Sequence, residues 1–369
     1  MAKIGDICEI LDSKRVPITA TERQPGPYPY YGANGIQDYV ADYIFDDELV
    51  LLAEDGGNFG SKDKPIAYRV SGKCWVNNHA HVLKPKEGLD VDYLCYSLMF
   101  YDVTGLVNGA TRQKLTQADM RKMEIPLPPI DEQRKIAAIL DKVSDLIAKR
   151  QQQLDKLDEA VKARFVEIFG EPDENPKHWQ EDELSHHLKV IGGYAFKSDG
   201  FTDEGIPVLR IGNINSGHFL PVNMVYWPDD LALARYKVFP GDLVMSLTGT
   251  VGKDDYGNVC ILGADYDEYY LNQRNAKLSI EKSLNKCYFS ELLKFPRIKK
   301  RLTGISRGIR QANISNKDIL TLRVPMPPIE LQEQFAAFVE QTEKTKIIIS
   351  HSLEKLETLK KALMQEYFG

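Results

Sequence analysis

Several features that would place a chain in a common protein class are missing from these 369 residues. The five cysteines are scattered without a C-x-x-C pair, which argues against a disulfide framework and against a thiolate zinc site. The chain start has no apolar core of a signal peptide, and nowhere do eighteen apolar residues run together. We therefore expect a protein of the reducing cytoplasm, without a membrane span.

Motifs of catalysis are missing as well. Gly249–Lys253 (GTVGK) and Gly56–Lys62 (GGNFGSK) are each followed by Asp, where a phosphate-binding loop would have Ser or Thr after its Lys. There is no G-x-S-x-G or H-E-x-x-H motif. Four histidines occur in pairs but lack a carboxylate or Cys at ligand spacing: His79, His81, His186 and His187. We expect no catalytic residue, metal or cofactor in this chain.

The net charge of −6 gives little support for a nucleic-acid partner, because local clusters of Lys and Arg carry the affinity for phosphate. Eight basic residues stand against one acid between Lys286 and Arg310, and six against one between Lys62 and Lys86. Either run alone is most simply a solvated surface. Because each half of the chain has one, nucleic-acid binding is as reasonable as that alternative.

The sequence does contain a long internal repeat. Ile125–Gly170 aligns without a gap with Val324–Gly369, at an offset of 324 − 125 = 199 residues. Solenoid repeats have periods of roughly 20–50 residues, so this is a duplicated module instead. Each copy is a globular region followed by a long helix. We expect four parts, at residues 1–124, 125–170, 171–323 and 324–369.

Each repeat opens with a Pro-Pro segment, which stiffens an extended chain, and continues as a helix. Apolar residues from Asp131 to Ile168 follow the 4,3 alternation of a coiled-coil seam, over a helix of roughly 57 Å. A lone helix would expose this stripe, so it needs a partner, which the second copy supplies. The predicted seam residues are Ile136, Leu140, Val143, Ile147, Leu154, Leu157 and Val161, with Phe335, Val339, Ile349, Leu353, Leu356 and Leu363.

The globular regions read as mixed α/β domains, with short apolar strands between Gly, Pro, Asn and Asp clusters and a helix near Asp92–Tyr101. Matched loops such as Gly57–Gly60 and Gly249–Gly252 recur in both, while the segments between them diverge. Divergent segments on a matched frame predict two domains that share a fold and recognise different targets.

Polar side chains cluster beside these loops. Asn, Gln and Arg pair with base edges and Lys contacts phosphates, although Asn is also common in ordinary turns. The candidates in the first domain are Tyr30, Tyr31, Asn34, Lys62, Lys64, Asn77, Asn78, Arg112, Gln113 and Lys114. Those in the second are Lys197, Arg210, Asn213, Asn215, Lys253, Asn272, Gln273, Arg274, Arg307, Arg310 and Gln311.

With IPLPPIDEQRKIAAIL (Ile125–Leu140), VPMPPIELQEQFAAFV (Val324–Val339) and GDLVMSLTGTVGK (Gly241–Lys253), the whole chain resembles a type I restriction-modification specificity subunit. The resemblance implies an α+β fold with two target-recognition domains, separated by two long helices that pack as an antiparallel coiled coil with internal pseudo-twofold symmetry. It implies a non-catalytic subunit whose domains each read half of a bipartite, asymmetric site in double-stranded DNA.

The resemblance also implies the partners. Two DNA-methyltransferase subunits would dock on the helices, and restriction/translocase subunits would join them. S-adenosylmethionine, ATP and magnesium would belong to those partners. Two alternatives remain: the specificity region of another restriction-modification type, and a coiled-coil adaptor between proteins without DNA binding.

Overall fold

The computed structural model describes the chain except residues 110–112, 216, 254 and 305–310 and the side chain of Gln311. The described residues form two compact units. Unit 1 is Met1–Gln152 with Ser350–Gly369, and unit 2 is Gln153–Ile349. Across the described residues, the search for a helix with the length and apolarity of a membrane span finds none.

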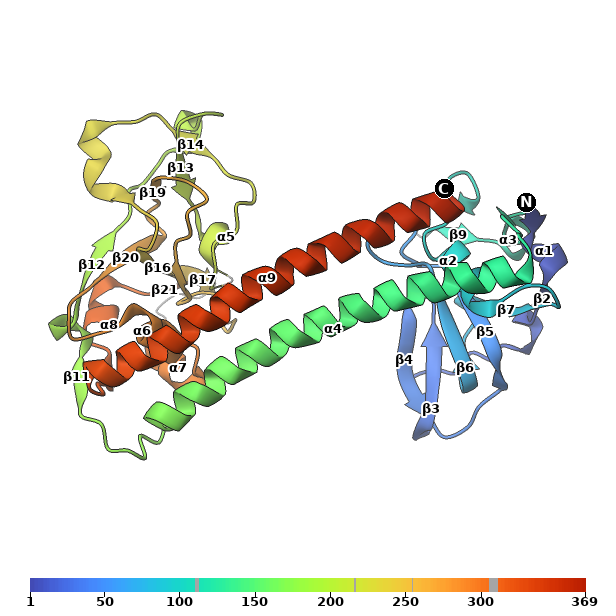
Figure 1. Ribbon diagram of the computed structural model, residues 1–369, viewed down its shortest axis with the longest axis horizontal. Helices are drawn as coiled ribbons and strands as arrows, with labels where there is room; N and C mark the ends of the chain where they lie inside the picture. Colours follow the sequence, from blue (N-terminus) through green and yellow to red (C-terminus); the bar gives the residue numbers. More distant parts are fainter. Residues whose placement is uncertain (110–112, 216, 254, 305–310) are drawn as a thin grey trace. The chain divides into compact units, whose positions relative to one another are not determined.

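Unit 1 is built on a six-stranded sheet of order β2-β7-β5-β6-β3-β4, in which β3 and β6 are parallel and the other neighbours antiparallel (Figure 1). Along β5, Val50 and Leu52 join one hydrophobic core while Leu49 and Leu51 join another, because successive strand residues face opposite sides. The strands are β2 (Cys8–Ile10), β3 (Pro25–Gly32), β4 (Gly35–Val40), β5 (Phe45–Ala53), β6 (Ala67–Val76) and β7 (Ala80–Pro85).

Helix α2 (Val91–Met99) packs on the face of the sheet that carries Val50 and Leu52. Asp90 is its N-cap, and the Asp90 carboxylate accepts the backbone N–H groups of Asp92 and Tyr93. The structure confirms the expected helix in this region, shifted by one or two residues. The smaller elements of unit 1 are β1 (Ala2–Lys3), α1 (Ile4–Ile7), β8 (Val107–Asn108), β9 (Lys114–Leu115), α3 (Gln117–Met120) and β10 (Glu124–Ile125).

Unit 2 contains two four-stranded sheets, of order β12-β20-β16-β18 and β14-β13-β19-β15. The first comprises β12 (Leu188–Gly192), β16 (Leu243–Ser246), β18 (Val259–Ile261) and β20 (Asn275–Ile280). The second comprises β13 (Ile206–Leu209), β14 (Tyr226–Trp227), β15 (Lys237–Val238) and β19 (Tyr269–Leu271). The remaining strands are β11 (Glu181–Glu183), β17 (Thr248–Thr250), β21 (Gln311–Asn313) and β22 (Arg323–Pro325); the helices are α5 (Ile211–Ile214), α6 (Lys286–Leu292), α7 (Pro296–Thr303) and α8 (Asn316–Leu320).

The same connection between globular region and long helix occurs in both units. In unit 1, β1 pairs with β10 so that Ala2 lies opposite Ile125. In unit 2, β11 pairs with β22 so that Asp182 lies opposite Val324. Ile125 and Val324 are equivalent residues of the repeat. Each globular region therefore closes its first strand against the strand that precedes its long helix, which confirms the mixed α/β fold expected from the sequence.

The two long helices are α4 (Ile130–Phe169) and α9 (Ile329–Phe368), of 40 residues each. Both begin directly after a Pro-Pro pair, and α4 is followed by Gly170, whose φ of +80° suits a residue that ends a helix. All thirteen predicted seam residues are buried or half-buried. The core of unit 1 includes the start of α4 and the end of α9, and that of unit 2 includes the end of α4 and the start of α9.

Candidate nucleic-acid interface

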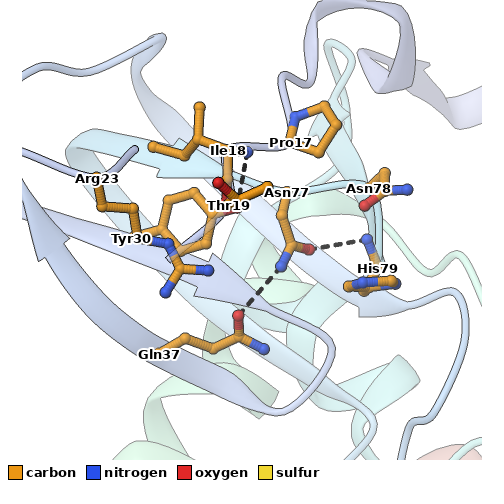
Figure 2. A pocket seen from close by; sticks show the side chains of 9 residues that line it. All are labelled: Pro17, Ile18, Thr19, Arg23, Tyr30, Gln37, Asn77, Asn78 and His79. Atoms are coloured by element: carbon orange, nitrogen blue, oxygen red, sulfur yellow. Dashed lines mark hydrogen bonds between the residues drawn. The ribbon is translucent and has the colours of Figure 1, made fainter. Parts of the chain in front are cut away.

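The predicted residues Tyr30 and Asn77 lie in a pocket of unit 1 with a volume of about 440 Å³ (Figure 2). Tyr30 is 1% exposed, and its hydroxyl lies 3.3 Å from the backbone oxygen of Ile18. Asn77, which follows β6, is 3% exposed and accepts the backbone N–H of His79 at 2.8 Å. These two side chains shape the pocket wall. The predicted Asn78, next along the chain, is exposed and also lines the pocket.

A second group of predicted residues meets around Gly56. The side-chain amide nitrogen of Asn34 donates to the backbone oxygen of Gly56 at 3.0 Å. The backbone N–H of Gly56 in turn donates to the backbone oxygen of Gln113 at 3.3 Å. Lys114 pairs with Glu54 at 3.0 Å. The structure thus brings together three segments that lie far apart in the sequence. Lys62 and Lys64 are exposed, whereas the half-buried ring of Tyr31 stacks on Tyr68 with 5.8 Å between ring centroids.

A buried charged network holds the segment that carries Gln113 and Lys114. His81 is fully buried; its Nδ1 lies 2.6 Å from Asp12 and its Nε2 lies 3.0 Å from the backbone oxygen of Leu115. Arg15 pairs with Glu54 at 2.5 Å. The donor atoms of Asp12, Glu54 and His81 lie within 4.8 Å of one another, a spacing that a metal ion could use. Arg15 already supplies a cation to both carboxylates.

We expect this network to make unit 1 sensitive to acid. Burial alone would raise the pKa of Asp12, but hydrogen bonds from His81, Gln117 and the N–H of Val82 outweigh it, so the pKa lies below its usual 3.8. Burial also opposes ionisation of Glu54, yet Arg15 and Lys114 hold its pKa below 4.5. Depressed carboxyl pKa values stabilise the fold above the unfolded values, and this stabilisation is lost as pH falls through the lowered folded values.

The test is a urea unfolding series across the acid range for the wild type and Asp12→Asn. The wild type should lose stability below about pH 4, because protonation of Asp12 and Glu54 weakens the network. Asp12→Asn should be less stable at neutral pH and show a shallower pH dependence. If the free energy of unfolding fell with pH equally steeply in the two proteins, Asp12 would have no role in acid sensitivity.

In unit 2 the predicted residues divide between buried supports and exposed groups. Asn213 is 2% exposed, and its amide nitrogen donates to the backbone oxygens of Leu220 and Val222 at 3.0 and 2.9 Å. Asn215 accepts from the amide of Asn258. Arg210 is half-buried and donates to the backbone oxygen of Asn223. These contacts hold the loop between α5 and β14.

The other predicted residues of unit 2 lie nearer the solvent. Asn272 is half-buried and accepts the backbone N–H of Arg274 through its side chain. Four side chains are exposed: Lys197, Lys253, Gln273 and Arg274. Arg112, Arg307 and Arg310 lie outside the described residues, and for Gln311 only the backbone is described, as part of β21.

The histidine pairs take separate structural roles. His79 contacts Asp55 at 2.6 Å, and His81 belongs to the buried network. In unit 2, His186 and His187 both contact Asp182, at 2.9 and 3.2 Å. The hydrogen bond from His186, with smaller contributions from the N–H of Glu183 and from His187, lowers the pKa of Asp182 to about 2.

Arg23 and Gln37 are two of the pocket-lining residues of unit 1 that were not predicted from the sequence as DNA contacts. Arg23 precedes β3, and its guanidinium lies 4.2 Å from the ring centroid of Tyr30. Gln37 lies on β4 and accepts from the amide of Asn77 at 3.2 Å. Neither lies in the loops that recur in both domains. Gln37 lies in β4, where Ile36 and Gln37 are both exposed, so no regular strand alternation in the sequence could have marked it.

In each unit, amide and basic side chains are exposed on loops beside packed sheets, an arrangement typical of domains that recognise a polar ligand. A family model described as "Type I restriction modification DNA specificity domain" matches residues 1–159 and 176–358. The chain thus belongs to the type I restriction-modification DNA specificity family. It is a type I restriction-modification specificity subunit.

Curated relatives are named as specificity subunits of type I restriction enzymes. The chain is 25% identical to a putative type I restriction enzyme specificity subunit of Haemophilus influenzae, covering 92% of this chain and 86% of that protein. It is also 25% identical to the type I restriction enzyme MjaVIII specificity subunit of Methanocaldococcus jannaschii, covering 99% and 90%. The fold resembles the crystal structure of a type I S subunit from M. genitalium, with a TM-score of 0.62, 15% identity and coverage of 100% and 95%.

Proposed function

We propose that the globular domains, residues 1–124 and 171–323, each read one half of a bipartite, asymmetric site in double-stranded DNA. The segments 125–170 and 324–369 set the spacing between the half-sites as an antiparallel coiled coil with pseudo-twofold symmetry. The observation that carries this proposal is that each unit contains opposite ends of α4 and α9 in its core. The burial of the seam residues supports it.

The exposed candidates are the direct DNA contacts in this proposal. In unit 1 they are Asn34, Lys62, Lys64, Asn78, Gln113 and Lys114; in unit 2 they are Lys197, Lys253, Gln273 and Arg274. The buried Tyr30, Asn77 and Asn213 position the loops that present these contacts. Arg112, Arg307, Arg310 and Gln311 belong to the same set by their place in the sequence. Lys side chains would contact phosphates and amide side chains the base edges.

The proposal extends to an assembly in the cytoplasm. Two DNA-methyltransferase subunits bind around the long helices, and restriction/translocase subunits complete the complex. S-adenosylmethionine, ATP and magnesium are held by those partners. Both long helices carry many exposed charged residues, among them Lys149 and Lys156 on α4 and Glu333 and Lys355 on α9. Such residues suit a polar protein interface around an apolar seam.

Binding of the complex to its bipartite duplex should depend steeply on salt. If 6–10 phosphates are neutralised, affinity should fall by roughly 10³–10⁵ between 50 and 200 mM salt. Replacing both Lys62 and Lys64 with Ala should reduce the slope of log affinity against log salt by about two. Lys122→Ala, which removes a lysine paired with Asp119, is the matched control. Affinity indifferent to salt would contradict DNA binding by this subunit.

Lengthening both helices should change the spacing of the half-sites. Inserting one heptad between Asp141 and Val161, and one at the matching place in α9, adds about 10 Å of helix and keeps the seam in register. We expect the gap between half-sites to lengthen by about three base pairs, at 3.4 Å each, with the bases read in each half unchanged. Sequencing of methylated adenines in host DNA measures this. An unchanged gap would exclude the helices as the spacer.

A further inference from the structure

The pocket of unit 1 in Figure 2 has its polar groups arranged in two layers. The inner layer is buried and occupied, since Asn77 donates to Gln37 and accepts from His79, and Tyr30 contacts Ile18. The outer layer contains Arg23, Gln37 and Asn78, which come from three separate segments. Because the inner layer is satisfied internally, its role is to orient the outer layer.

The orientation of Gln37 is determined by two neighbours. Its amide oxygen accepts from Asn77 at 3.2 Å, so its amide nitrogen is the atom left for a ligand. That nitrogen packs against Gly32, where a Cβ atom would lie only 2.1 Å from it. Gln37 itself is exposed, in contrast to the buried Asn77 beneath it. The pocket therefore presents Gln37 as a hydrogen-bond donor.

Arg23 adds further donor capacity. Its guanidinium lies over Tyr30, and Nη1 pairs with Asp38 at 3.3 Å. Nε is buried and has no hydrogen-bond partner among the described residues. Because Nε is enclosed by the protein, a ligand would meet the terminal N–H groups of the guanidinium instead, in a side chain that is 18% exposed. Asp38 offsets the charge of Arg23, so the pocket suits a neutral acceptor better than a phosphate.

We propose that this pocket reads a guanine of the half-site recognised by unit 1, with Gln37 and Arg23 as the residues that determine specificity. Guanine is the base whose major-groove edge offers two acceptors, N7 and O6, whereas cytosine offers a donor there. Two donors in one pocket match that pattern. Asn78, which can donate and accept, contacts the neighbouring position. This inference rests on the proposed reading of half-sites by the globular domains.

The test uses the complete complex with its modification subunits and the variant Gln37→Glu, which replaces the amide donor with an acceptor of the same size. Binding is measured to duplexes in which each base pair of the site is replaced in turn. The wild type should prefer guanine at one position of the unit 1 half-site by at least about ten-fold. Gln37→Glu should lose that preference, with every position of the other half-site unchanged.

Two further variants separate specificity from charge and folding. Gln24→Glu adds the same charge at an exposed side chain that does not line the pocket, and should keep the wild-type preference. Gly32→Ala should weaken the preference for guanine by displacing Gln37. An unchanged preference in Gln37→Glu, a change in both half-sites, or the loss of a preference for a base other than guanine would overturn the inference. Failure of the wild type to bind a bipartite duplex would instead overturn the proposed function.

Discussion

Replacing Phe165 with alanine is expected to lower the free energy of unfolding of unit 2 by about 3–5 kcal/mol. Phe165 lies on α4 and is fully buried. Its ring centroid lies 5.3 Å from that of Phe335 on α9 and 5.4 Å from that of Tyr288 on α6. The substitution leaves a cavity where both long helices meet the globular region, and close-packed neighbours fill such a cavity only in part.

Urea unfolding followed by tryptophan fluorescence measures this effect. Trp179 reports on the region, because its indole N–H donates to the backbone oxygen of Phe169 at 2.8 Å. The matched control is Phe239→Ala, since Phe239 belongs to the same unit and is 47% exposed. The control should cost less than about 1 kcal/mol. Equal losses in the two variants would show that Phe165 is not part of a packed core.

Replacing Gln133 with leucine should destabilise unit 1 by about 2–4 kcal/mol. Gln133 is fully buried at the start of α4. Its amide oxygen accepts the N–H of Asp90 at 2.9 Å, and its amide nitrogen donates to the backbone oxygens of Gly88 and Pro128 at 2.9 and 2.8 Å. Leucine fills a similar volume but leaves these backbone groups buried without partners, which costs more than the hydrogen bonds themselves.

Gln332→Leu should have an effect of similar size in unit 2. Gln332 is also fully buried, accepts the N–H of Asn285 at 2.8 Å and donates to the oxygen of Pro327 at 2.8 Å. Urea unfolding compares both variants with Gln152→Leu, an exposed glutamine of α4 that should change stability by less than about 0.5 kcal/mol. If the two buried glutamines behaved like Gln152, the amides would not be needed to fasten the helices.

Gln133 and Gln332 make equivalent contacts in the two copies of the repeat. Asp90 and Asn285 are the N-cap residues of α2 and α6. Tyr93 and Tyr288, in those helices, donate to the backbone oxygens of Pro126 and Pro325 at 3.0 and 2.8 Å. Each Pro-rich segment is thus fixed at both ends to a short helix of its own globular region. Within each unit, these hydrogen bonds fix the start of the long helix against the globular region that precedes it in the chain.

The sequence by itself determined the features that depend on local pattern. The 4,3 spacing of apolar residues predicted α4 to within one residue at each end, and the repeat predicted α9 as its second copy, because helix periodicity is encoded in neighbouring residues. The match of Gln133 with Gln332 was visible in the repeat. Its meaning was not, since the partners Asp90 and Asn285 lie more than forty residues away.

Only the tertiary structure decided which polar side chains face solvent. Tyr30, Asn77 and Asn213 are indistinguishable in the sequence from exposed loop residues, yet they are buried. Gln37 and Arg23 carry no sequence signal but meet Asn77 and Tyr30 in one pocket. The physical reason is that the exposure of a strand or loop side chain depends on contacts between segments far apart in the chain, whereas the long helices carry their apolar pattern within each turn.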